Sequence, residues 1–200
     1  MNNAGYGQMG PLELITADEL RAQLETNVVG LHAATRTFLP LIRRHARPGE
    51  GRIVHVASVL GRLSIPMAGA YNASKHAVVA LAETLRLEIG REIPVMVVEP
   101  GAIQTEFRST LKKAWGDMPE RAVGTNYHDT IHRYATKRED FSREHGLTSE
   151  ACATLIADAM TQAHPPRRLI IGQDSYWGQV AHRILPAWVF EAFMRRSYGV

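Results

Sequence analysis

Residues 58–75 read S-V-L-G-R-L-S-I-P-M-A-G-A-Y-N-A-S-K. An apolar run at 53–57 (I-V-H-V-A) precedes this stretch and is typical of a buried strand, and a long helical pattern follows it. Tyr71 and Lys75 are four residues apart, so a helix places them on one face, one turn from each other. Ser58 comes at the carboxyl end of the expected strand, where open α/β sheets bind their ligands. The sequence therefore predicts that a phenol, an ammonium group and a hydroxyl group meet at one site.

These three groups are suited to moving a proton to or from a substrate oxygen. A free tyrosine has a pKa near 10 and exchanges protons poorly at neutral pH. A neighbouring ammonium group favours the phenolate and lowers the pKa of the tyrosine. A shift to about 7 requires roughly 4 kcal/mol of differential interaction. Spacing alone is equally consistent with a pair on a solvated helix surface, so the surrounding motifs have to decide between the two interpretations.

Four motifs, in order along the chain, resemble those of the short-chain dehydrogenase/reductase family. They are Asn2-Asn3-Ala4-Gly5, similar to its N-N-A-G turn; Asn27, similar to its helix asparagine; the trio Ser58, Tyr71 and Lys75; and Pro100-Gly101-Ala102-Ile103-Gln104-Thr105, similar to its P-G-x-x-x-T segment. The resemblance runs without a gap from residue 2 to about residue 110, and more loosely to the end. It implies an α/β fold with a Rossmann-like, doubly wound parallel sheet.

The resemblance also implies a function, an NAD- or NADP-dependent oxidoreductase that interconverts a carbonyl and a secondary alcohol. Tyr71 would be the general acid or base, Lys75 would lower its pKa and bind the nicotinamide ribose, and Ser58 would hold the substrate oxygen. Asn27 would complete a proton relay through water. Aromatic residues in the variable regions suggest an apolar substrate. The cofactor contacts that the resemblance implies come from Asn3, Ala4, Gly5, Tyr71, Lys75, Pro100, Gly101, Ile103 and Thr105.

The pattern of the whole chain predicts strands alternating with helices, as in parallel α/β sheets. We expect helices at 16–42, 70–89 and 149–163, and strands at 52–58, 94–99 and 168–172. The 200 residues fit a single partial domain. Within it, 106–147 lacks strand signals and is expected to cover the substrate, and 175–200 is expected to form an amphipathic tail.

The chain opens on the turn that, in the family, follows the fourth strand. We identify no strand–glycine-loop–helix unit of the kind that holds a pyrophosphate, and expect an N-terminally truncated sheet. By comparison with the family, the absent part of the sheet and its helices would comprise on the order of 80 residues, because each βαβ unit needs about thirty or more. Ile53, Val54 and Val56 would then be partly uncovered at a sheet edge, which invites aggregation.

Two hypotheses for function follow from this reading. The first is the oxidoreductase, for which residues 1–200 alone are expected to have little or no activity. The second is a catalytically silent fragment or interaction module that cannot bind the cofactor alone. Binding of NADH and NADPH by the purified chain distinguishes them. A serine hydrolase is disfavoured, because the chain has no G-x-S-x-G sequence.

Composition excludes several other classes. Hydrophobic residues make up 45% of the chain, which is ordinary for a globular protein. The net charge of +3 comes without a cluster of lysine and arginine, so we expect no nucleic-acid partner. The single cysteine, Cys152, excludes an intrachain disulfide. His128 and His132 flank Asp129 without forming H-E-x-x-H, so we expect a solvated helix face and no metal.

Partners and location are inferred from apolar faces. The helices at 16–42 and 70–89 predict a homodimer or homotetramer acting on a small-molecule substrate. No signal peptide or bilayer-length apolar run is visible, which favours a cytoplasmic location. The tail carries Trp177, Trp188 and Phe193 near Arg195 and Arg196, so peripheral contact with a membrane is an alternative. Burial against the substrate pocket or a partner subunit is the commoner fate of such a stripe.

Overall fold

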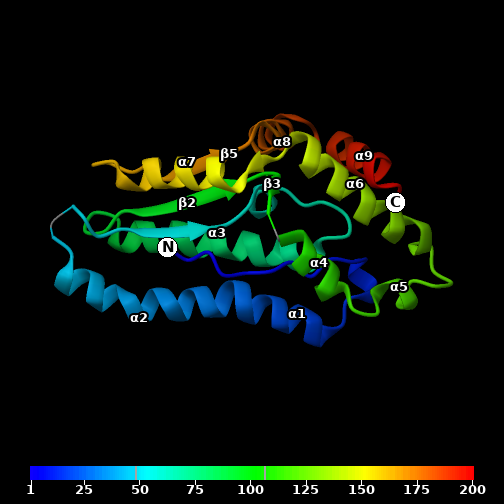
Figure 1. Cartoon of the computed structure of the whole chain (residues 1–200), viewed down its shortest axis with the longest axis horizontal. Coiled ribbons are helices and arrows are strands. Elements are labelled where there is room, and N and C mark those ends of the chain that lie inside the picture. The colour runs from blue at the N-terminus through cyan, green and yellow to red at the C-terminus, as the bar shows by residue number, and fades with distance from the viewer. Residues whose placement is uncertain (48, 106) are drawn as a thin grey trace.

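A parallel sheet forms the middle layer of the computed structural model, which describes residues 1–47, 49–105 and 107–200. The side chains of 108, 109, 112, 132 and 135–139 also lie outside the described part. The strands β1 (Ile53–Val56), β2 (Val95–Pro100) and β5 (Arg168–Ile171) lie in the order β1-β2-β5 (Figure 1). Ile53 pairs with Val95, and Val98 pairs with Leu169. The predicted α/β fold with a parallel sheet is confirmed.

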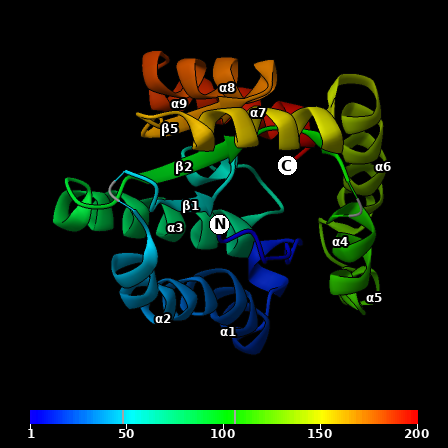
Figure 2. The same cartoon turned by 60° about the vertical axis from the view of Figure 1, so that its left-hand side comes forward.

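Long helices cover one face of this sheet (Figure 2). α1 (Ala17–Leu24), the π-helical turn Glu25–Val29 and α2 (Gly30–His45) follow one another directly, and α3 (Gly69–Ile89) lies between them and the sheet. Thr16 and Glu19 form the predicted capping box at the start of α1. The helix continues through Pro40 rather than ending near residue 42. Apolar side chains of β1 and β2 pack here against α2 and α3, namely Ile53, Ala57, Val95 and Val97 against Leu31, Val78, Val79 and Ala82.

The other face of the sheet is covered by α7 (Ser149–Thr161), whose Cys152 and Ala159 pack against Val54, Met96 and Val98. The tail forms two helices, α8 (Gln173–Ile184) and α9 (Ala187–Tyr198). α8 packs against β5 and against the short 3-10 helix η3 (Val59–Gly61) that follows Ser58.

The segment between β2 and α7 projects from the sheet as three helices, α4 (Phe107–Trp115), α5 (Met118–Arg121) and α6 (His128–His145). Two short strands, β3 (Ile103–Gln104) and β4 (Leu147–Thr148), pair in parallel and hold its two ends together. These strands were not predicted, because two residues are too few to show a period.

The outer edge of β1 differs from the expectation. The main chain of Asn2 accepts from Val56 N at 3.0 Å and donates to Val54 O at 2.7 Å, so it continues the sheet by one residue. Ile53 and Val54 are buried, and only Val56 is partly exposed. The prediction that Ile53 and Val54 would be uncovered is therefore wrong, because helices cover both faces of the strand.

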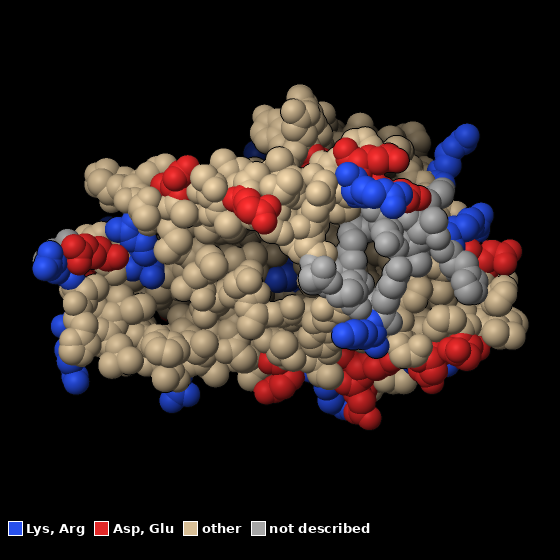
Figure 3. All heavy atoms as spheres, in the orientation of Figure 1, with Lys and Arg blue, Asp and Glu red and all other residues tan. Residues whose placement is uncertain are grey.

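Positively and negatively charged side chains are interspersed on the face of the molecule that Figure 3 shows. The same face is hollowed between α7 and the layer formed by α1 and α2. Phe38 and Leu41 on α2 and Leu87 on α3 are exposed apolar side chains. They lie on the helices for which an oligomer interface is predicted, and the homo-oligomer stays a prediction. Within the described residues, no helix combines the length and the apolar character needed to cross a membrane.

Candidate active site

A cavity of about 450 Å³ lies at the carboxyl ends of β1 and β2, and Ser58, Tyr71 and Lys75 all line it. Ser58 follows β1, and Tyr71 and Lys75 lie in the first two turns of α3. The structure thus brings together the three groups that the sequence predicts to converge. Six further predicted residues also line the cavity: Asn3, Gly5, Pro100, Gly101, Ile103 and Thr105. Ala4 and Asn27, which were predicted at the site, are not among the lining residues.

Ser58 is held by its neighbours in a way that leaves its hydroxyl proton available. Its Oγ accepts a hydrogen bond from Leu60 N at 3.2 Å, which caps η3. Its only described acceptor, Pro100 O, is 3.5 Å away, at the limit of a hydrogen bond. Gly61 fixes the η3 turn against α3, because a Cβ there would lie 2.7 Å from Lys75 O. This close approach requires glycine and sets Ser58 beside the helix that carries Tyr71 and Lys75.

Lys75 is an almost fully buried ammonium group. Its Nζ donates to Val56 O at 2.9 Å and lies 5.7 Å from the centre of the Tyr71 ring. Burial lowers the pKa of Lys75 from its ordinary value to about 8. The Tyr71 ring is buried as well and contacts the ring of Phe107, with 5.7 Å between their centres. A buried positive charge therefore lies close to the Tyr71 ring.

Asn27 lies behind the cavity, in the π-helical turn between α1 and α2. Its Nδ2 donates to Tyr6 O at 2.9 Å and to Ser74 Oγ at 3.0 Å, and its Oδ1 accepts from Tyr6 N at 3.1 Å. The side chain therefore ties the N-terminal segment to α3, one residue before Lys75. π-Helical turns occur frequently at functional sites.

The N-terminal glycines require a correction to the sequence analysis. Gly5, Gly7 and Gly10 have the spacing G-x-G-x-x-G, which that analysis overlooked. Here the segment leads into a three-residue 3-10 helix, Leu12–Leu14, and not into a long helix that could hold a pyrophosphate. The glycines instead give close packing, because Cβ atoms there would lie 2.9 Å from Asn27 Oδ1, 2.6 Å from Leu111 Cδ2 and 2.7 Å from Met118 Cε, respectively.

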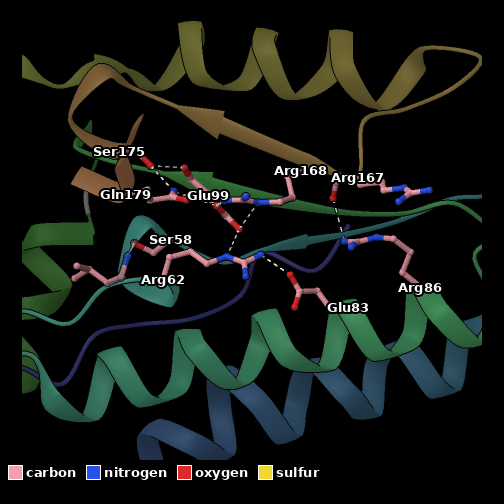
Figure 4. A network of polar contacts seen from close by, with 10 residues as sticks. Ser58, Arg62, Glu83, Arg86, Glu99, Arg167, Arg168, Ser175 and Gln179 are labelled. Carbon is pink, nitrogen blue, oxygen red and sulfur yellow. Dashed lines mark hydrogen bonds and ion pairs between the residues drawn. The ribbon is translucent and has the colours of Figure 1, made fainter. Parts of the chain in front are cut away.

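A buried carboxylate supports the loop that carries Pro100 and Gly101. Glu99 accepts hydrogen bonds from Arg62 Nε at 2.9 Å and from Arg168 Nη2 at 2.6 Å (Figure 4). Burial raises the pKa of Glu99, but the hydrogen bonds from Arg168 and Arg62 outweigh it and hold the pKa below its ordinary value. Ser175 Oγ also donates to Glu99 O, at 3.0 Å. The network joins β2, β5, α8 and the segment after Ser58.

Asp174 is a lining residue that the sequence analysis missed. Its Oδ2 accepts from Ala102 N at 2.7 Å, and a Cβ on Gly101 would lie 2.2 Å from its Oδ1. Gly172 has φ +95°, a conformation that favours glycine, and a Cβ there would lie 2.5 Å from the same oxygen. Two glycines thus make room for one carboxylate. The sequence alone does not show this contact, because Asp174 and its partner Ala102 are 72 positions apart.

Metal binding finds no support among the side chains that the structure describes, which contain no group of three or more histidine, cysteine or carboxylate ligands. The side chain of His132, one of the two histidines considered from the sequence, lies outside the described part.

Comparison with known proteins extends this description. The family model "short chain dehydrogenase" matches residues 1–115. The uncharacterized oxidoreductase YbbO of Escherichia coli is 32% identical over 195 residues, covering 97% of this chain and 65% of that protein. NADPH-dependent 3-dehydrocapnine reductase of Ornithobacterium rhinotracheale is 30% identical, with 93% and 65% covered. The chain therefore spans just under two thirds of the length of these relatives.

Solved structures agree with the fold. A short-chain dehydrogenase from Streptomyces avermitilis has a TM-score of 0.69 at 26% identity, covering all of this chain and 69% of that one. A short-chain dehydrogenase/reductase from Burkholderia phymatum, solved in complex with NAD, has a TM-score of 0.71 at 29% identity, with 90% and 62% covered. Since the family model also matches more than half of the sequence, this chain belongs to the short-chain dehydrogenase family.

Proposed function

We propose that this chain provides the catalytic and nicotinamide-side part of an NAD- or NADP-dependent oxidoreductase that interconverts a carbonyl and a secondary alcohol. The observation that carries the proposal is the shared cavity, which a hydroxyl group, a phenol and a buried ammonium group line together. Similarity to relatives named as oxidoreductases and reductases supports the same class of reaction.

The cavity suits the nicotinamide end of a dinucleotide. Main chain without side chains borders it at Gly5 and Gly101, so a flat ring can approach closely. Ile103 and Thr105 also line the cavity, and Lys75 would bind a hydroxyl group of the nicotinamide ribose. The bound nicotinamide would donate or accept the hydride. The other steps fall to the side chains of this chain.

Tyr71 transfers the proton in this proposal. During reduction its hydroxyl group donates a proton to the carbonyl oxygen, and during oxidation it accepts one from the alcohol. The buried ammonium group of Lys75 lies close to the Tyr71 ring, and a neighbouring positive charge stabilises a phenolate, the form that accepts the proton. Ser58 donates its hydroxyl hydrogen to the substrate oxygen, which favours the negative charge that develops there.

Asn27 acts as a positioning residue here. Its hydrogen bonds to Tyr6 and Ser74 hold the N-terminal segment against α3, and they fix the turn that carries Lys75. The family resemblance also implies a proton relay through water, and this relay is part of the same proposal. For it, a polar group of Asn27 would hold a water molecule beside Lys75.

A binding measurement tests the proposal against the alternative of a silent module. NADH and NADPH are titrated into the purified chain, and the fluorescence of the reduced nicotinamide is recorded. We expect weak, saturable binding that Lys75→Met abolishes and that Lys113→Met, at an exposed position on α4, leaves unchanged. Binding that ignores Lys75, or no binding up to millimolar cofactor, would favour the silent module.

A further inference from the structure

A second cavity, of about 370 Å³, lies between α6 and α9 and is here named the α6–α9 cavity. Its apolar wall consists of Tyr134, Phe193, Met194 and Tyr198. The Tyr134 and Tyr198 rings contact one another, with 5.8 Å between their centres. Such a wall suits an aliphatic or ring-containing chain, because flat aromatic surfaces bury apolar area without losing much side-chain freedom.

Two guanidinium groups border the same cavity, Arg133 from α6 and Arg196 from α9. Arg133 is held in place by hydrogen bonds from Nε to Asp129 O at 3.3 Å and from Nη2 to Thr130 Oγ1 at 3.4 Å. Neither arginine forms an ion pair with a carboxylate in the described part of the chain. Both arginines are exposed, and arginine binds carboxylates and phosphates with paired hydrogen bonds, so this end of the cavity is suited to an anion.

Tyr134 lines both the α6–α9 cavity and the candidate active site. The ring is buried, and its hydroxyl group lies 3.6 Å from the sulfur of Met9, which also lines the candidate active site. Tyr71, Tyr134, Met194 and Tyr198 belong to one continuous apolar cluster. A molecule with its reacting carbon near Tyr71 would therefore enter the α6–α9 cavity only when the buried Tyr134 ring moves aside.

We propose that the α6–α9 cavity is the distal part of the substrate site, and that the substrate is an elongated apolar molecule with a negatively charged end. The charged end binds between Arg133 and Arg196, and the apolar part passes Tyr134 towards Ser58 and Tyr71. This inference rests on the proposed function for the identity of the reacting end. It adds a charge requirement and a minimum length, which the proposed function does not contain.

The charge requirement is tested by direct binding to the full 200-residue chain. The probe is 11-(dansylamino)undecanoic acid, compared with its uncharged methyl ester by dansyl fluorescence. We expect the acid to bind at least about 10-fold more tightly than the ester. The double variant Arg133→Gln/Arg196→Gln should lose this preference and bind the ester as before. The matched control is Arg36→Gln/Arg44→Gln, two exposed arginines on α2. Equal affinity for acid and ester, or a preference that survives the first double variant, overturns the proposal.

The length requirement is tested at Cys152, the only cysteine, which lines the candidate active site. A chain anchored at the two arginines should reach this cavity and slow the reaction of Cys152 with a thiol reagent. We expect dodecanoate to protect Cys152 several-fold, butanoate to give no protection, and Arg133→Gln/Arg196→Gln to remove the effect of dodecanoate. Charge-dependent binding without protection of Cys152 would contradict the passage along Tyr134. Neither experiment needs cofactor or turnover. A negative result would therefore overturn the distal substrate site without contradicting the proposed oxidoreductase reaction. An absence of turnover, in turn, would not affect these two binding results.

Discussion

Arg62 lies four residues after Ser58, and its Nε donates to Oε1 of Glu99, the residue immediately before Pro100 and Gly101, at 2.9 Å. One ion pair thus links the two segments that follow β1 and β2, both of which contribute lining residues to the candidate active site. Glu99 is fully buried, and a buried charge is tolerated only when it is paired and hydrogen-bonded.

Glu99→Ala is therefore expected to destabilise the fold strongly. Arg62 and Arg168 would lose a shared partner, and removing one member of a buried ion pair typically costs about 3–5 kcal/mol. Glu92→Ala is the matched control, since Glu92 pairs with Arg43 at the exposed surface, where solvent screening leaves such pairs little effect on stability. Urea denaturation of both variants checks the difference. Similar losses in the two variants would show that the Glu99 network does not stabilise the fold.

Gly101→Ala should disrupt the loop after β2, because its Cβ would overlap the Asp174 carboxylate. A second substitution, Asp174→Ala, opens that space, so the double variant should lose less stability than the sum of the two single variants. Residues in contact commonly show coupling of about 0.5–3 kcal/mol. Thermal unfolding of the four proteins in the cycle measures this coupling, and strict additivity would contradict the close contact.

Much of the fold could be predicted because its signals are local. The helix of Tyr71 and Lys75, the strand before Ser58 and the capping box at Thr16 depend on neighbours within a few residues. The two-residue strands β3 and β4 could not be predicted, because 44 positions separate Ile103 from its partner Leu147.

The residues of the candidate site likewise differ in whether local sequence or long-range packing determines their position. The catalytic trio stands out by spacing and residue type, whereas Asp174 and Tyr134 reach the cavities only through the packing of α8 and α6. A single sequence carries no signal for such contacts. The N-terminal glycines show that a familiar motif can also mislead. Gly7 and Gly10 have the spacing of a phosphate-binding loop, but they pack closely against Leu111 and Met118.

Burial of Lys75 predicts a dependence of stability on pH. Its pKa is about 8 in the folded protein and near its ordinary value of 10.5 when unfolded, so between these values the unfolded chain binds more protons. The folded state is therefore penalised below pH 8, by up to about 3 kcal/mol, and the penalty disappears as the pH rises to 10.5. The stability of the wild type relative to Lys75→Met should rise across this window and stay flat below it. Lys113→Met keeps Lys75 and should therefore retain the rise of the wild type in urea denaturation at a series of pH values.

His55 gives the corresponding effect in acid. Its side chain is buried in β1, and burial lowers its pKa to about 4 from an ordinary value of 6.5. Since the unfolded chain binds the proton more readily, stability should fall by up to about 3 kcal/mol as the pH drops from 6.5 to 4. His55→Gln should remove this part of the acid sensitivity, and His32→Gln, at an exposed position on α2, should retain it. Parallel pH profiles for the two variants would refute the assignment.

The proton transfer assigned to Tyr71 is tested most directly by kcat in Tyr71→Phe. The assay uses a chimera in which the part of YbbO that this chain does not match is joined to the 200 residues, and NAD(P)H-dependent reduction of a carbonyl panel is followed. Tyr176→Phe, at an exposed position on α8, is the control. We predict that Tyr71→Phe lowers kcat by at least the roughly 100-fold typical of losing a general acid or base, while Tyr176→Phe stays within about twofold of the parent. Turnover by Tyr71→Phe within a few-fold of the parent would contradict the account.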